Sequence, residues 1–222
     1  MSKDASVLGS SVGRKIIMGL SGLFLCSFLL IHLYINLFLL KQDGGQTFDV
    51  YAEFMSTYPL IRPLEIVLFA GFLVHAGVGL WLWIRNRRIR PRQYEVQGGS
   101  ATASFSSRMS FVTGVFVLLF LTIHVKQFFI NSRFLSTGQP MHEIVSSAFV
   151  NPLYVLLYLA AFVVLGYHLK HGFQSAFQTF GLLHGKYKKV IDGVGFIFWF
   201  LIPLAFASIP IYFYLTLHSA GH

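Results

Sequence analysis

Five long apolar stretches, separated by shorter polar segments, dominate the pattern of hydrophobic and polar positions. Each reaches the roughly 20 residues that a helix needs to cross the hydrocarbon core of a bilayer. They cover residues 16–40, 64–84, 109–130, 152–177 and 190–217. Pro203 and Pro210 lie inside the last stretch, where neighbouring helices can satisfy the carbonyl groups that a proline leaves free. The pattern predicts an all-α integral membrane protein with five transmembrane helices, and residues 1–222 as a single membrane domain.

Composition agrees with this interpretation and narrows the chemistry. The chain is 55% hydrophobic and only 11% charged, whereas soluble domains carry about 25% charged residues. Cys26 is the only cysteine, which excludes an internal disulfide, a Cys-rich zinc or iron–sulfur site and the attachment of a c-type haem. No small-residue cleavage site follows the first apolar stretch, so we expect it to stay in the mature protein.

The basic residues predict the orientation in the membrane. The net charge is +9, but the Lys and Arg side chains cluster between apolar stretches as orientation signals do, so nucleic acid is set aside as a partner and membrane lipid is expected. Only four of the 17 lie on the side away from the N-terminus: Lys41, Arg62, Lys126 and Arg133. Because basic residues remain in the cytoplasm, we expect a cytoplasmic N-terminus and an external C-terminus.

Four of the nine histidines fall one to each of the first four apolar stretches. They are His32, His75, His124 and His168. A polar side chain inside a membrane is costly enough to indicate a function. For any one of them, a hydrogen bond between helices is an ordinary alternative, but four together make that alternative much weaker.

The depths of two of these histidines match on the outer side. His32 lies nine residues before Lys41, which is about 13 Å of helix. His124 lies nine residues before Arg133, at the same depth. We therefore expect His32 and His124 to share an outer level.

The other two histidines share an inner level. His75 lies ten residues before Arg85, about 15 Å from the inner end. His168 lies sixteen residues after Pro152, about 24 Å below the outer end of its inward-running helix. Of the two histidines in this stretch, His168 fits the level better than His171, which lies past Lys170 and closer to the inner interface.

Two imidazoles from different helices at one level can supply both axial ligands of a haem iron, so two such pairs predict two haem b groups stacked across the membrane. Filled axial positions favour electron transfer over oxygen chemistry. A zinc site is the competing interpretation, but it needs three or four ligands at one level. A porphyrin between helices needs the backbone to approach closely, and glycines near His75 and His168 would allow this. Ordinary packing between helices is the alternative explanation for these glycines. They are Gly71, Gly77, Gly79, Gly166 and Gly172.

These histidines and three further motifs resemble a known family. The motifs are Gly13-Arg14-Lys15 before the first stretch, His168 followed four residues later by Gly172, and the run from Gly172 to Phe177. Over nearly its whole length the chain resembles the five-helix, di-haem cytochrome b anchor of bacterial succinate:quinone oxidoreductases, a type also found in some quinol:fumarate reductases. The resemblance implies a four-helix haem-binding bundle in the bacterial cytoplasmic membrane.

The resemblance also implies partners and sites. It implies that His75 and His168 ligate the inner haem and that His32 and His124 ligate the outer haem. It also implies that this chain lacks the dicarboxylate site, and that a flavoprotein and an iron–sulfur subunit of succinate dehydrogenase dock on the cytoplasmic face. Six side chains are candidates to hold the inner haem: Arg14, Lys15, Arg85, Arg108, Lys170 and His171. The positive-inside bias alone also explains the basic residues among them.

Quinone, usually menaquinone, reacts near the outer haem in similar proteins. Glu53 and Glu65 are the acids available for proton exchange there, with Glu53 preferred. Some fumarate reductases of this type carry a glutamate two residues before the fourth histidine, where this sequence has Gly166, and that departure favours succinate oxidation. The alternatives are a quinol:fumarate reductase anchor, another di-haem electron carrier, and, from a different class, a haem-free transporter whose histidines relay protons.

Overall fold

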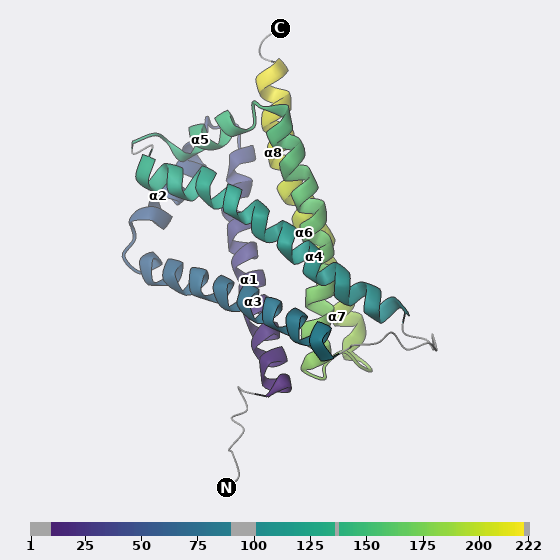
Figure 1. The fold of residues 1–222 in the computed structure, drawn as a ribbon. Helices are drawn as coiled ribbons and strands as arrows, with labels where there is room; N and C mark the ends of the chain where they lie inside the picture. Colours follow the sequence, from purple (N-terminus) through teal and green to yellow (C-terminus); the bar gives the residue numbers. More distant parts are fainter. Residues whose placement is uncertain (1–9, 90–100, 136–137, 220–222) are drawn as a thin grey trace.

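The computed structural model describes residues 10–89, 101–135 and 138–219, the side chains of residues 11, 89 and 101–108 excepted. This part of the chain folds into helices joined by turns and contains no strand (Figure 1). Five of its helical spans are long and apolar enough to cross a membrane, which confirms the predicted fold class in outline. These spans are Val12–Leu40, Ile61–Arg88, Met109–Leu135, Pro152–Thr179 and Tyr187–Ser219.

Several spans combine more than one helical element. The second and fourth spans lie in α3 (Ile61–Ile89) and α6 (Pro152–Thr179). The first and third spans start in α1 (Ser11–Asn36) and α4 (Ala101–His124). A 3₁₀ turn, η2 (Leu37–Leu40), ends the first, and a π-helix, η3 (Val125–Leu135), ends the third directly after His124. The fifth span consists of α7 (Tyr187–Phe196), the π-helical segment η4 (Ile197–Leu201) and α8 (Ile202–Ser219).

Polar capping residues fix where α1 and α6 begin. The hydroxyl of Ser10 accepts a hydrogen bond from the N–H of Gly13 at 2.9 Å, so α1 begins before Arg14. At α6 the side chain of Asn151 accepts from the N–H of Leu153 at 2.9 Å. Proline at the first helical position, where its missing N–H costs nothing, places the start of α6 where the sequence predicts it.

The helices pack around α1 and α6. Helix α1 contacts α3 and α6, α4 contacts α6, and α8 packs against α6 and α1. Helix α1 begins and α8 ends at opposite ends of the bundle (Figure 1). We call the end that carries α2 (Gln46–Thr57) and α5 (Met141–Ala148) the α2–α5 end, and the opposite end the α7 end.

Two short helices at the α2–α5 end are additions to the predicted picture. Helix α2 lies between the first two apolar stretches, and α5 lies between the third and the fourth. The buried core also lies toward this end, where side chains of α2, α5 and η3 belong to the same buried cluster as side chains of α6 and α8. Its members include Phe48, Phe128, Ile144, Tyr158 and Phe206.

The prolines of the fifth span have a visible consequence for its neighbour. Pro203 has no N–H for the carbonyl of Trp199, four residues earlier, and the π-helical η4 precedes it. The oxygen of Trp199 faces α6, where a Cβ built on Gly166 would lie only 2.7 Å from it. The fifth span therefore packs so closely on α6 that residue 166 has no room for a side chain.

Candidate functional site

The four intramembrane histidines meet as two pairs. The rings of His75 in α3 and His168 in α6 have centroids 6.2 Å apart and planes at 80°. The rings of His32 in α1 and His124 in α4 have centroids 5.8 Å apart and planes at 84°. Depth along the helices predicted this grouping, and the structure brings the same residues together.

The spacing within each pair fits a single metal ion between two imidazoles. Metal–imidazole bonds are about 2.0–2.1 Å long, and about 1.1 Å separates a ring nitrogen from its centroid, so a linear arrangement puts the centroids about 6.3 Å apart. The observed separations of 6.2 and 5.8 Å lie close to this value. Within the part of the chain that the structure describes, no three His, Cys, Asp or Glu side chains form a group that could hold a metal ion.

Hydroxyl groups of the neighbouring helices contact the first pair. Nδ1 of His75 lies 3.2 Å from the hydroxyl of Ser21 in α1. Nδ1 of His168 lies 3.3 Å from the hydroxyl of Thr113 in α4. An imidazole that binds a metal through one nitrogen usually donates its other N–H to such a partner, which fixes the ring orientation.

The second pair has different partners. Nδ1 of His124 lies 3.1 Å from the hydroxyl of Tyr158, a residue of α6 that is only 3% exposed. Nδ1 of His32 lies 3.4 Å from the amide of Asn36, one turn further along α1. Nδ1 of His75, His168 and His124 thus faces a hydroxyl oxygen that can accept its proton, the arrangement that directs Nε2 toward a ligand. Nδ1 of His32 instead faces an amide N–H donor.

Two glycines next to the first pair were not singled out by the sequence. A Cβ on Gly22 would lie 3.2 Å from Cε1 of His75, and one on Gly114 would lie 3.3 Å from Cε1 of His168. Both glycines follow the hydroxyl residue that contacts the same ring. The glycines that we expected near the porphyrins instead face Phe24 (Gly71), Met18 (Gly79) or Trp199 (Gly166), and a Cβ on Gly77 or Gly172 would meet nothing within 4 Å.

Cationic side chains gather beside the first pair at the α7 end. The guanidinium of Arg14 lies 3.6 Å from the ring centroid of Trp81, and that of Arg85 lies 5.1 Å from it. A pocket of about 280 Å³ opens between α1 and α3, lined by Arg14, Trp81, Ile17, Gly77 and Val78. Gly77 and Val78 follow His75 by two and three residues, so the pocket lies along the helix that carries His75.

The other predicted cationic contacts are more dispersed. Lys170 lies over the ring of Trp199 at 4.8 Å, and Lys15 is exposed. His171 is half-buried one turn beyond the paired His168 in α6. The side chain of Arg108 lies outside the described residues. The structure therefore brings Arg14 and Arg85 together and leaves Lys15 and Lys170 apart from them.

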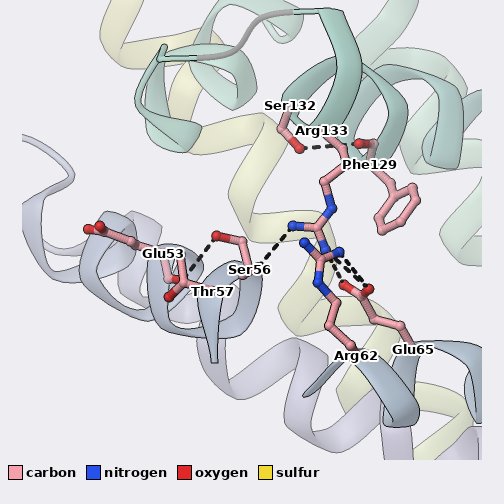
Figure 2. A network of polar contacts seen from close by, with 8 residues as sticks. All are labelled: Glu53, Ser56, Thr57, Arg62, Glu65, Phe129, Ser132 and Arg133. Carbon is pink, nitrogen blue, oxygen red and sulfur yellow. Dashed lines mark hydrogen bonds and ion pairs between the residues drawn. The ribbon is translucent and has the colours of Figure 1, made fainter. Parts of the chain in front are cut away.

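The two predicted acids lie in different surroundings. The carboxylate of Glu65 in α3 accepts hydrogen bonds from Arg133 at 2.8 and 3.1 Å and from Arg62 at 3.2 Å. Arg133 also donates to the carbonyl of Ser56 at 3.0 Å, so it ties η3 to both α3 and α2 (Figure 2). Glu53 is exposed on α2 and its carboxylate points away from this network (Figure 2).

A second acidic contact at this end was also missed by the sequence. Asp49 of α2 accepts the backbone N–H of His142 at 2.8 Å, and its other oxygen lies 2.5 Å from Nδ1 of the same residue. The contact joins α2 to α5. In the turn before α2, Asp43 accepts from the Thr47 side chain and from the N–H groups of Thr47 and Gly45, and these hydrogen bonds, the Thr47 side chain first, hold the pKa of Asp43 below its usual value.

No family model, curated protein or solved structure matches this chain.

Proposed function

We propose that this chain is the membrane anchor and cytochrome b subunit of a bacterial succinate:quinone oxidoreductase, holding two b-type haems with its two histidine pairs. The observation that carries the proposal is the spacing of these pairs, 6.2 Å for His75 with His168 and 5.8 Å for His32 with His124. The Nδ1 contacts of His75, His168 and His124 with hydroxyl groups support it, because they leave Nε2 for the iron. Each haem, when bound, would supply a one-electron carrier with both axial positions filled.

The α7 end suits the inner haem and the hydrophilic partners. Arg14 lines the pocket between α1 and α3, and Arg85 shares its contact with Trp81. We assign these two side chains to the haem propionates, and Lys15, Arg108, Lys170 and His171 remain candidates from the sequence. By the positive-inside rule this end faces the cytoplasm, where a flavoprotein and an iron–sulfur subunit would dock.

The α2–α5 end would then face outward and receive the quinone. Menaquinone takes up two electrons and two protons on reduction, so we look for a group that can exchange protons at this end. Glu65 is engaged by two arginines, which favours Glu53, whose side chain is exposed. Glu53 is our candidate for proton exchange.

The packing at residue 166 supports the oxidation of succinate. Some fumarate reductases of the similar type carry a glutamate at this position. Here a side chain would meet the carbonyl of Trp199, since even a Cβ would lie 2.7 Å from it. A glutamate cannot be added without separating α6 from the fifth span.

Purification of the tagged chain from its native membrane tests the proposal. We expect a flavoprotein and an iron–sulfur subunit to co-purify, and succinate to reduce b-type haem in the complex. The same purification after His75→Ala is the control, and it should lose succinate-reducible haem. Partners of a hydrogenase type, or haem that dithionite reduces and succinate does not, would contradict the assignment, and a preparation without haem would favour a transporter.

A further inference from the structure

The helix pairs α1–α3 and α4–α6 repeat one arrangement around the first histidine pair. In α1 the hydroxyl of Ser21 contacts Nδ1 of His75, and in α4 the hydroxyl of Thr113 contacts Nδ1 of His168. Ser21 and Thr113 are 92 residues apart, the same separation as the two histidines of the second pair. The same offset matches further positions of α1 with identical residues in α4, among them Phe24 with Phe116, Phe28 with Phe120, and Ile31 with Ile123.

Both hydroxyl groups donate their proton to their own helix. The Ser21 hydroxyl donates to the carbonyl of Met18 at 3.1 Å. The Thr113 hydroxyl donates to the carbonyl of Met109 at 2.8 Å and lies 3.1 Å from that of Ser110. Each oxygen is thereby left as an acceptor for the imidazole N–H. The ring then carries its proton on Nδ1 and presents the lone pair of Nε2.

The glycine that follows each hydroxyl residue holds the ring against the helix. Gly22 and Gly114 leave the Cε1 atoms of the two histidines 3.2 and 3.3 Å from where a Cβ would be. A Cβ at either position would be in tighter contact with the imidazole edge than most side chains allow, so each ring would have to shift. Ser21 with Gly22, and Thr113 with Gly114, therefore form two equivalent seats for a ligand histidine.

The second pair lacks these seats. His124 meets a tyrosine hydroxyl from α6, and His32 meets an amide from its own helix. The two pairs therefore have chemically different hydrogen-bond partners. A change to Ser21 or Thr113 should reach only the first pair.

We propose that Ser21 and Thr113 are positioning residues that orient His75 and His168, raise their basicity and lower the reduction potential of the haem iron at this pair. The inference rests on the proposed function. An imidazole that donates its Nδ1–H is a stronger electron donor, and it stabilises the oxidised iron more than the reduced iron. The potential at the other pair does not depend on these two hydroxyls.

A potentiometric titration of the purified complex, followed at the b-type absorption bands, tests the proposal. The variants are Ser21→Ala and Thr113→Val. Losing a hydrogen bond of ordinary net strength changes the ratio of oxidised to reduced haem roughly two- to tenfold at a fixed potential, and tenfold corresponds to about 59 mV for one electron. We expect one of the two titration waves to move to a more positive potential in both variants, and Thr113→Ser to retain the wild-type value.

Matched controls lie on the same two helices. The Ser27 hydroxyl donates to the carbonyl of Phe24 at 2.7 Å, and that of Thr122 donates to the carbonyl of Leu118 at 2.9 Å, and both side chains are exposed. Ser27→Ala and Thr122→Val remove the same groups away from the histidines. We expect both waves to stay at their wild-type potentials in these controls.

The outcomes separate this inference from the proposed function. Unchanged potentials in Thr113→Val with two haems bound, or equal shifts of both waves, would overturn the inference and leave the proposed function intact. Loss of one haem in Thr113→Val but not in Thr113→Ser would support it, whereas loss in both variants would overturn it. A wild-type chain without b-type haem would refute the proposed function and this inference together.

Discussion

Gly166→Ala tests the close contact between α6 and the fifth transmembrane span. The added Cβ would lie 2.7 Å from the carbonyl oxygen of Trp199 and 3.8 Å from Cγ of Pro203. Rotating a side chain cannot relieve a clash with a backbone oxygen. We therefore expect α6 and the fifth span to move apart in this variant.

The magnitude follows from two opposing effects. Forcing one extra methyl group into a packed contact costs about 1–3 kcal/mol. Alanine in place of glycine stabilises a helix interior by up to about 1 kcal/mol. Gly166→Ala should therefore lower the free energy of unfolding by up to about 2 kcal/mol.

Gly172→Ala is the matched control in the same helix. A Cβ at residue 172 would meet no atom within 4 Å, so only the gain in helix propensity applies. A reversible denaturant titration in lipid micelles measures all three proteins. The difference between the two variants isolates the clash, and Gly166→Ala proving as stable as Gly172→Ala would refute the close contact.

Three further changes probe the remaining contacts. Tyr158→Phe keeps the ring but removes the hydroxyl 3.1 Å from Nδ1 of His124, so we expect only the haem at this pair to titrate at a more positive potential, and a shift of the other haem would contradict the assignment. Arg133→Gln breaks an ion pair whose side chains are 17% and 24% exposed, and we expect a loss of about 1–3 kcal/mol in the unfolding titration, between the values for exposed and buried pairs; fully additive losses with Glu65→Gln would indicate no coupling. The pKa of Asp43 is lowered in the folded protein, so its stabilising contribution is complete above the unfolded pKa of about 3.9 and is lost as the pH falls below that value. Asp43→Asn should therefore flatten the acid side of the profile of stability against pH. An unchanged profile would argue against this role of Asp43.

The membrane spans and the histidine pairs could be predicted from sequence because both depend on distance along a helix. A span needs about 20 apolar residues, and a rise of 1.5 Å per residue converts sequence position into depth. This was enough to group His32 with His124 and His75 with His168. Their role as haem ligands stays a prediction.

The contacts at the α2–α5 end could not be predicted because each involves a residue outside the apolar stretches, where depth along a helix does not show which segments are neighbours. Asp49 and His142 are 93 residues apart, and neither lies in an apolar stretch. Glu65 and Arg133 likewise meet only when α3 and η3 are side by side. Depth carries no information on which surface helices lie next to one another.

The hydroxyl and glycine residues that contact the first histidine pair form a sequence pattern, but only the structure shows its meaning. A hydroxyl residue followed by glycine occurs in many transmembrane helices for packing alone. The repeat of Ser21 and Gly22 at Thr113 and Gly114, with the same offset as the histidines, becomes meaningful once both rings lie against these residues. Likewise, Gly166 has a reason only when the freed carbonyl of Trp199 is opposite it.

Haem content per chain, measured by its reduced-minus-oxidised spectrum in the wild type and four single histidine variants, tests the proposed di-haem function most directly. We expect two b-type haems per wild-type chain. We expect His75→Ala and His168→Ala to lose the same spectral component, and His32→Ala and His124→Ala to lose the other. No haem in the wild type, or a spectrum that groups His32 with His75, would contradict it.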